Sequence, residues 1–312
     1  LHRPSSNRSR VEAAIQKVDS SLLTNLEWME GDLTDQASLE TALVGVNRVF
    51  HCAALVSFHR RDRDALRQIN AEGTANLVNA MLHLQTPRLV HVSSVAALGR
   101  KAGQPTDEST LFEEHPGTSA YARSKHRAEM EAFRGAVEGL SAGLVVVNPT
   151  VILGPGDYRQ SSAALFRAID LGLSWYPKGS GGYVGSDDVA EVCLRLGDSD
   201  IRDERFVLCA EHRNHKDVMA RIAEALGRTK PSRPVHPWLA GVAWRLVWLV
   251  EQLTGRRSMI SKESLASGME HQRYDGSKIV RTLASTNQPW EYTPIDEVIS
   301  STAKAYRLEA DS

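Results

Sequence analysis

Short, continuously apolar runs alternate with longer amphipathic segments between residues 26 and 149. Apolar runs of this kind are typical of strands buried on both faces of a parallel sheet, and the segments between them have helical length and periodicity. Right-handed crossovers then predict an α/β, doubly wound Rossmann-type fold, with ligands at the carboxyl ends of the strands. The predicted strands are LEWME (26–30), RVFHCAA (48–54), RLVHVSS (88–94), GLVVVNP (143–149) and RFVLCA (205–210), and the predicted helices cover 10–20, 36–44, 64–84 and 119–138.

The regular alternation ends at about Thr150, and the remaining chain reads as shorter, mostly helical pieces. We therefore predict a dinucleotide-binding domain over 1–155 and a smaller substrate-binding region over 156–312, interleaved with the first. Further helices are expected up to Leu171 and over 187–196. The stretch Trp238–Leu253 is 16 residues long and carries Arg245 in its middle, which is too short and too interrupted for a membrane span. An amphipathic helix over a core or pocket is expected there, with a membrane-surface helix as the alternative.

A dinucleotide-binding domain normally opens with a strand, a glycine-rich turn and a helix whose N-terminus holds the pyrophosphate. The sequence begins instead with the basic turn LHRPSSNRSR, at a point that corresponds to the end of a second strand. A strand–turn–helix unit and second strand of about 30 residues would precede it. We expect the native protein to begin earlier than this chain. The alternative is a protein that lacks the unit, which would leave apolar sheet edges unpaired.

The composition is that of an ordinary globular enzyme, with 42% hydrophobic and 24% charged residues in a chain of 312. Basic and acidic residues number 37 and 38, and this balanced charge does not indicate a nucleic-acid partner. Cys52 and Cys209 lie in apolar runs and are expected to be buried, reduced thiols, and the scattered histidines predict no metal site. A reduced, cytoplasmic location fits, and the polar N-terminal residues do not form a signal peptide.

A Y-x-x-x-K pattern, Tyr121 to Lys125, lies on the helix predicted over 119–138. The spacing places both side chains on one helix face. An ammonium beside a phenol would lower the phenol pKa and suit Tyr121 to proton exchange. The pattern alone is weak, since a solvated helix face gives the same spacing.

Polar residues also end two of the predicted strands. Ser93 and Ser94 close RLVHVSS, where a hydroxyl can donate to a substrate carbonyl oxygen as negative charge develops on it. The alternative for a serine at this point is a simple turn residue. Asn148 and Pro149 close the next strand.

Six motifs together resemble the extended short-chain dehydrogenase/reductases, the NAD-dependent epimerase/dehydratase family, over most of residues 1–210. The resemblance is nearest to the branch that contains dihydroflavonol reductases and 3β-hydroxysteroid dehydrogenases. The motifs are GDLTD (31–35), HCAA (51–54), NAEGTANLVNA (70–80), S-S-x-x-x-x-G (93–99), Y-x-x-x-K (121–125) and N-P-T-x-x-x-G-P (148–155).

The resemblance implies a catalytic set of three residues. Tyr121 would be the general acid/base, Lys125 would hold the nicotinamide ribose, and Ser94 would orient the carbonyl. The implied cofactor-binding residues are Asp32 and Leu33 at the adenine end, Ala53 and Ala54 beside the cofactor, Ser93, Tyr121, Lys125, and Asn148 and Pro149 near the nicotinamide. A capping or turn role is the alternative for Asp32, and Asn70 either binds cofactor or stabilises its helix.

Arg3 and Arg10 lie where the second strand would end. In relatives that resemble flavonoid reductases, basic residues there meet the 2′-phosphate, so NADP is expected, with NAD as the alternative. An ordinary basic loop is the remaining interpretation. A homodimer through a helix pair that includes the Tyr121 helix is expected by resemblance alone.

Three functions stay open. The first is NAD(P)-dependent interconversion of a carbonyl and a secondary alcohol on a bulky apolar small molecule. The second is a nucleotide-sugar epimerase. Dehydration is disfavoured because Ser94 is followed by Val95, Ala96 and Ala97, with no carboxylate. The third is a non-catalytic NADP-binding regulatory protein.

Overall fold

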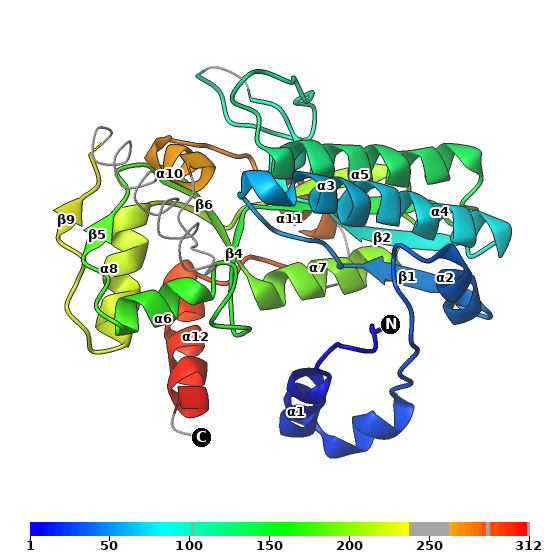
Figure 1. The fold of residues 1–312 in the computed structure, drawn as a ribbon, viewed down its shortest axis with the longest axis horizontal. Helices are drawn as coiled ribbons and strands as arrows, with labels where there is room; N and C mark the ends of the chain where they lie inside the picture. Colours follow the sequence, from blue (N-terminus) through cyan, green and yellow to red (C-terminus); the bar gives the residue numbers. More distant parts are fainter. Residues whose placement is uncertain (101–102, 237–261, 285–287, 311–312) are drawn as a thin grey trace.

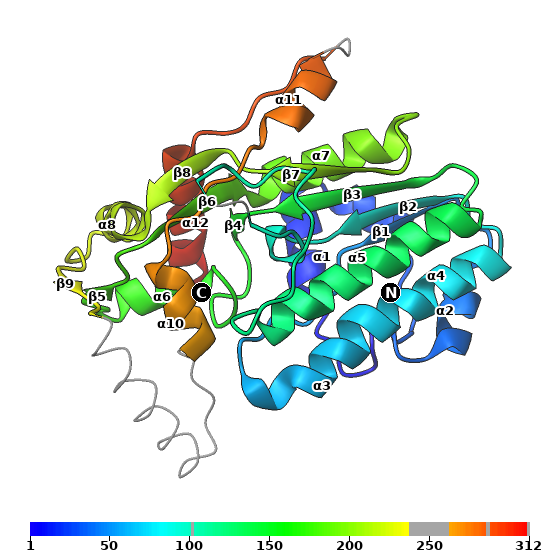
Figure 2. The same ribbon diagram turned by 90° about the horizontal axis from the view of Figure 1, so that it is seen from above.

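A four-stranded parallel sheet forms the centre of the molecule, in a computed structural model that describes residues 1–100, 103–236, 262–284 and 288–310. The strand order is β1 (Arg48–His51), β2 (Arg88–Val92), β3 (Leu144–Pro149) and β7 (Glu204–Leu208). Helices cover both faces of the sheet (Figures 1 and 2). The predicted doubly wound α/β fold is therefore confirmed.

One face of the sheet is covered by α2 (Gln36–Leu43), α4 (Gly73–His83) and α5 (Ala120–Glu138). Leu144 and Val146 of β3 face these helices, whereas Val145 and Val147 face α7 (Ser186–Asp198) and α11 (Ser277–Ala284) on the other side. Successive side chains of a strand point to opposite faces. The continuous apolar run in β3 is thus explained by burial on both faces.

The helix predicted over 64–84 consists of three joined pieces. They are α3 (Arg63–Leu66), which follows the short turn η2 (Arg60–Asp62), the π-helical segment η3 (Arg67–Glu72), and α4. π-Helical turns inside helices are rare and frequent at functional sites. Here the segment carries the buried Asn70.

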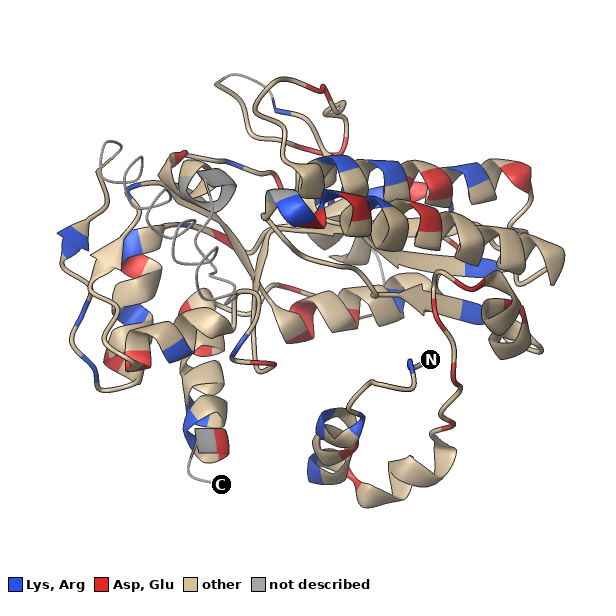
Figure 3. Cartoon of the chain, viewed as in Figure 1, with Lys and Arg blue, Asp and Glu red and all other residues tan. Residues whose placement is uncertain are grey.

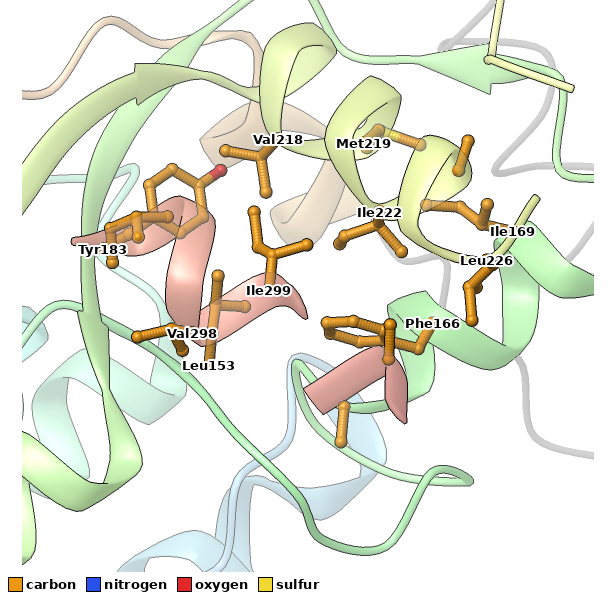
Figure 4. Close-up of a cluster of buried hydrophobic side chains, with 14 of the residues drawn as sticks. Leu153, Phe166, Ile169, Tyr183, Val218, Met219, Ile222, Leu226, Val298 and Ile299 are labelled. Carbon is orange, nitrogen blue, oxygen red and sulfur yellow. The ribbon is translucent and has the colours of Figure 1, made fainter. Parts of the chain in front are cut away.

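A second region, on the left in Figure 1, contains a sheet that the sequence pattern did not predict. Its strands are β4 (Val151–Leu153), β6 (Ser180–Gly185) and β8 (Glu211–Asn214), and β5 (Trp175–Tyr176) pairs separately with β9 (Arg233–Pro234). The remaining elements are helical, as expected: α6 (Ala164–Asp170), α8 (His215–Ala225), α10 (Lys262–Met269) and α12 (Ile295–Ala310). Phe166, Ile222 and Ile299 join α6, α8 and α12 in one apolar core (Figure 4).

The N-terminal residues form α1 (Ser9–Val18) and the 3-10 turn η1 (Ser20–Asn25), and neither contributes a buried residue. The prediction of a strand at 26–30 was wrong, because only Glu30 makes a single parallel bridge, to His2. The predicted helix at 238–253 lies outside the described residues.

The outer edge of β7 is closed by side chains. The backbone N–H of Val207 donates to the Glu108 carboxylate (2.8 Å), and that of Cys209 donates to the Tyr292 hydroxyl (3.2 Å). A strand edge with unpaired backbone groups is prone to pair with another chain. The Glu108 contact also holds the long loop before α5 against the sheet.

The surface and the hydropathy of the helices give two further observations. Lys and Arg are interspersed with Asp and Glu along α5 and α8 (Figure 3). Within the residues that the structure describes, no helix is both long and apolar enough to cross a membrane.

Candidate active site

Helix α5 carries Tyr121 and Lys125 one turn apart. The helix begins after Ser119, whose hydroxyl oxygen accepts from the backbone N–H of Ala122 (3.0 Å). A serine cap of this kind satisfies one of the unpaired N–H groups at a helix start. It fixes the first turn of α5, which carries Tyr121, and the helix itself lies beside the sheet (Figure 2).

Lys125 is buried against the carboxyl end of β2. Lys125 is only 2% exposed, and its Nζ donates to the carbonyl of Val92 (2.9 Å). Burial lowers the pKa of Lys125 to about 8, and the negative charge of Glu129, with a further contribution from Cys52, opposes that change. The ammonium form therefore predominates at neutral pH.

Tyr121 is half-buried, and burial raises its pKa, while a side-chain hydrogen bond with Ser94 works in the opposite direction. The expectation that Lys125 lowers this pKa is wrong for this structure, because the ammonium points to the Val92 carbonyl. A phenol with a raised pKa keeps its proton at neutral pH. Tyr121 is therefore a protonated phenol at neutral pH. The ring of Phe58 lies 5.6 Å from the Tyr121 ring and borders the same site.

Ser94 has the turn role that was the alternative for it, and its side chain also lies at Tyr121. Its hydroxyl oxygen accepts from the backbone N–H of Ala96 (3.2 Å), which caps the 3-10 turn η4 (Val95–Ala97), and it also meets Tyr121. Gly99 ends this turn against the backbone carbonyl of Leu111, where an added Cβ would overlap. A glycine is therefore required at position 99, and the close approach locks the turn that presents Ser94.

Ser93 and Asn148 turn inward, toward a carboxylate that the sequence reasoning missed. The Ser93 hydroxyl donates to Glu129 Oε2 (2.7 Å), and Asn148 Nδ2 donates to the same oxygen (2.7 Å) and to the carbonyl of Ser94 (3.0 Å). All three side chains belong to residues at most 5% exposed. Asn148 Oδ1 has no hydrogen-bond partner among the described residues. Pro149 is buried next in the chain, at the end of β3.

The loop after β1 is held beside α5 by Asn70. The Asn70 side chain accepts from the Leu55 N–H (2.7 Å) and donates to the Leu55 carbonyl and to the Ser124 hydroxyl (both 2.9 Å). Ala53 and Ala54, in the same loop, are exposed and carry no bulky side chain. We call these two residues the shelf after β1. Of the two roles expected for Asn70, these contacts support the structural one.

The remaining predicted residues lie nearer the N-terminus. Asp32 Oδ1 accepts from the N–H and the hydroxyl of Thr34 (both 2.8 Å); these bonds lower its pKa, and the charge of Arg3 adds a smaller lowering. The turn role expected as an alternative for Asp32 is therefore present. The carbonyl of Leu33 accepts from Asn76 Nδ2 (2.9 Å) on α4, which ties this turn to the sheet-covering helices.

Arg3 and Arg10 have different surroundings. The charge of Arg3 lowers the pKa of Asp32. Arg10 instead forms ion pairs with Glu309 of α12 (3.0 Å) and with Asp157 (3.5 Å). The structure does not bring the two guanidinium groups to one place.

Glu129 and Phe58 are the site residues that sequence reasoning did not find. Glu129 follows Lys125 by four residues, so the signal for it was a third polar residue on the buried face of α5. For Phe58 no comparable signal exists in the sequence. The buried thiol expected at Cys52 was wrong, since Cys52 is exposed, whereas Cys209 is buried as predicted.

A pocket between α7 and α12 lies elsewhere, and none of the predicted catalytic residues lines it; its walls include Gly154, Asp188, Thr293 and Thr302. Across the described ranges, no group of three or more His, Cys, Asp or Glu side chains could hold a metal ion.

The sequence model described as "NAD dependent epimerase/dehydratase family" matches residues 2–209 of this chain. The chain belongs to that family. The match spans the parallel sheet, the loop after β1, the Ser94 turn and the Tyr121 helix. It therefore covers every residue of the site described above.

Several curated relatives are similar to this chain. Sterol demethylase protein B of Methylococcus capsulatus is 33% identical over 69% of this chain and 65% of its own length. A Synechocystis protein provisionally named dihydroflavonol 4-reductase is 29% identical over 83% of this chain and 76% of its own. A 3 beta-hydroxysteroid dehydrogenase/Delta 5→4-isomerase of vaccinia virus is 33% identical over 46% of each chain. Reductases and dehydrogenases are thus among the relatives of this family member.

Solved structures share the fold. The crystal structure of gox2253 has a TM-score of 0.77 and 26% identity, covering 99% of this chain and 90% of that one. A nucleoside-diphosphate-sugar epimerase from Pseudomonas aeruginosa has a TM-score of 0.73 and 23% identity, over 99% and 88% of the two chains. The dTDP-glucose 4,6-dehydratase DesIV, solved with NAD bound, has a TM-score of 0.71 and 18% identity, over 97% and 84%. At these identities the last two show the fold alone.

Proposed function

We propose that this family member is an NAD(P)-dependent reductase/dehydrogenase that interconverts a carbonyl and a secondary alcohol. The observation that carries the proposal is the contact between Tyr121 and Ser94, with Lys125 buried one turn further along α5. A protonated phenol beside a second hydroxyl is suited to bind a carbonyl oxygen and protonate it. No carboxylate lies in the turn Val95–Ala97 that follows Ser94, as an elimination would require.

The residues present fit a nicotinamide dinucleotide at the carboxyl edge of the sheet. Ala53 and Ala54 offer an open shelf there, and Lys125 offers a charged donor group beside it. When bound, the nicotinamide supplies or accepts the hydride. Lys125 would hold the ribose hydroxyls, and Pro149 would border the nicotinamide.

In the reducing direction, the Ser94 hydroxyl would donate a hydrogen bond to the substrate carbonyl oxygen. Tyr121 would then deliver its phenolic proton to that oxygen as negative charge develops on it. Because burial raises the Tyr121 pKa, the proton is present on the phenol at neutral pH.

The cofactor proposed is NADP, with NAD as the alternative. Since Arg10 is engaged by Asp157 and Glu309, the preference rests on Arg3. Asp32 and Leu33, on the turn that Arg3 faces, would meet the adenine end. Ser93 and Asn148 are buried, so they would not touch the nicotinamide directly. They would instead hold the nearby backbone in place through their hydrogen bonds to Glu129.

The substrate proposed is a bulky apolar small molecule. Val95 and Leu98, just after Ser94, pack with Tyr274 in an apolar cluster on this side of the sheet. Apolar lining with a few polar groups at the reacting centre is usual for such sites. The relatives named as reductase and dehydrogenase agree with this substrate class.

A cytoplasmic homodimer is part of the same proposal. Met130 and Val137 leave 55% and 89% of their surface exposed on the outer face of α5, and would be covered by a second copy. Sedimentation analysis of the chain and of a Val137→Glu variant tests this, since the variant should be monomeric.

The test of the function combines cofactor titration with turnover of a panel of apolar ketones and aldehydes. We expect tighter binding of NADPH than of NADH. Tyr121→Phe should keep cofactor binding and lose carbonyl reduction by about 10²- to 10⁴-fold, the usual contribution of a positioned general acid. Tyr306→Phe, which removes a hydroxyl bonded to Asp170 on the second region, is the matched control and should keep activity.

Two outcomes would contradict the proposal. Cofactor binding without turnover of any carbonyl would support the non-catalytic function instead. Equal turnover by the wild type and Tyr121→Phe would show that another group supplies the proton.

A further inference from the structure

Glu129 is a buried carboxylate on the same helix as Tyr121 and Lys125. It is 2% exposed and accepts three hydrogen bonds, from Ser93 Oγ (2.7 Å), Asn148 Nδ2 (2.7 Å) and Arg205 Nη1 (2.8 Å). An isolated buried carboxylate is costly unless it is paired and hydrogen-bonded. The three donors meet this condition for Glu129.

The three donors lie in or directly after three different strands of the parallel sheet. Ser93 follows β2, Asn148 lies in β3 and Arg205 lies in β7, so Glu129 joins these neighbouring strands to α5. Asn148 also donates to the Ser94 carbonyl (3.0 Å). A continuous chain of hydrogen bonds therefore runs from Glu129 through Asn148 to the residue whose hydroxyl meets Tyr121.

An ionised carboxylate is an acceptor only, whereas an amide has one acceptor oxygen and one donor group. Ser93, Asn148 and Arg205 all donate to Glu129. A glutamine at position 129 would set its NH₂ group against at least one of these donors. The network thus requires a carboxylate and not merely a side chain of this shape.

The charge of Glu129 faces Lys125, His126 and Arg205. Lys125 also faces Cys52, His51 and His91, from the strands beneath it. Among these groups, Glu129 is the main one that raises the pKa of Lys125 against the effect of burial. The Glu129 carboxylate therefore interacts with two parts of the site. It reaches the Ser94 turn through hydrogen bonds and Lys125 through its charge.

We propose that Glu129 is the positioning residue of this site, holding the Ser94 turn through Ser93 and Asn148 and supplying the negative charge that faces Lys125. This inference rests on the proposed function for its effect on turnover. The contacts and the charge themselves can be tested without turnover.

The decisive variant is Glu129→Gln in the full chain, with lysines labelled with ¹³C at Cε. The Lys125 signal, identified by its loss in Lys125→Arg, should titrate below the wild-type value of about 8, because the opposing charge is gone. Carbonyl reduction should fall by about 10- to 100-fold in kcat/KM, the scale of a small misplacement of reacting groups. Glu131→Gln, at a half-buried position of the same helix where the carboxylate pairs with Arg134 and not with the site residues, is the control and should change neither measurement.

Glu129→Asp separates the effect of the carboxylate's position from the effect of its charge. Because it keeps the charge, it also serves as a second test if Glu129→Gln fails to fold. It keeps an acceptor-only group near Lys125 but draws the carboxylate back by one methylene. The Lys125 titration should stay near the wild-type value, while kcat/KM falls because the contacts to Ser93 and Asn148 are broken.

The outcomes distinguish this inference from the proposed function. An unchanged Lys125 titration in Glu129→Gln, or wild-type kcat/KM in Glu129→Asp, would overturn the role of Glu129. A lowered Lys125 pKa in Glu129→Gln, in a protein that reduces no carbonyl, would support the network and refute the reductase.

Discussion

The side-chain amide of Asn70 lies 2.9 Å from the hydroxyl oxygen of Ser124, which in turn donates to the carbonyl of Tyr121 (2.8 Å). This pair joins the π-helical segment before α4 to the first turn of α5. Because Asn70 also bonds both backbone groups of Leu55, one buried side chain sets the distance between the shelf after β1 and Tyr121.

Replacing Asn70 by Ala should therefore weaken both the fold and cofactor binding. The change removes three hydrogen bonds and leaves the Leu55 backbone without its partner, so the free energy of unfolding should fall by about 2–4 kcal/mol. Urea unfolding and NADPH titration measure the two effects. Asn79→Ala, on the exposed side of α4, should change the unfolding free energy by less than about 0.5 kcal/mol. Equal stability of the two variants would contradict the role of Asn70.

Cofactor affinity should depend on pH through Lys125. Its pKa of about 8 means that the ammonium loses its proton as the pH rises through that value, and with it a charge and a donor for the ribose. NADPH binding should thus be strongest below about pH 8 and weaken above it. Lys125→Arg should bind more weakly but show no such decline, because a guanidinium stays protonated. A wild-type affinity that is flat across this range would rule out Lys125 as the cofactor contact.

Arg88 should be among the residues most important for stability. Its guanidinium is buried at the start of β2 and donates to the carbonyls of Ala142 (2.6 Å), Ile201 (2.7 Å) and Leu196 (2.5 Å). Arg88→Met would leave all three carbonyls without this donor, at about 1–3 kcal/mol for each buried group that stays unpaired. We expect a loss of about 3 kcal/mol or more in the free energy of unfolding, measured by urea denaturation.

The control for Arg88 is an exposed ion pair. Lys230 pairs with Glu224 (2.9 Å), with both side chains more than half exposed. Lys230→Met should cost at most about 1 kcal/mol. A similar cost for the two substitutions would show that the Arg88 contacts are not maintained in solution.

His51 should make the fold sensitive to acid. It is 4% exposed, bonds the Thr74 hydroxyl (2.9 Å) and lies 5.1 Å, ring to ring, from the buried His91. Burial lowers its pKa from 6.5 to about 3, with a further lowering from Lys125. The unfolded chain therefore binds this proton at a higher pH than the folded chain, and stability is lost as the pH falls from about 6.5 toward 3.

The measurement is the free energy of unfolding at about pH 7 and about pH 5. The wild type should lose more stability between these values than His51→Asn, in which one titrating group is gone. His83→Asn, at an exposed position, should follow the wild type. If His51→Asn shows the same loss as the wild type, His51 is not held neutral in the folded protein.

The parallel sheet and the helices over it could be predicted from the sequence because their residues carry a strong local signal. The run LVVVNP of β3 is apolar on both faces, and α5 shows helical periodicity from Ser119 to Glu138. The small sheet of the second region carried no such signal. The sequence of β6, SGGYVG, contains turn-forming glycines, and that of β8, EHRN, is polar. These segments become strands because β6 pairs with β4 on one side and with β8 on the other.

Residue spacing alone was enough to predict that Tyr121 and Lys125 share one face of a helix and that Ser94 ends a buried strand. That Lys125 points to Val92, and that burial raises the Tyr121 pKa, became visible in the folded chain. The folded chain also shows that Glu129 gathers Ser93, Asn148 and Arg205. The physical reason is that hydrogen-bond partners and desolvation depend on which strands and helices meet in space, and residues as far apart as 129 and 205 meet only once the sheet has formed.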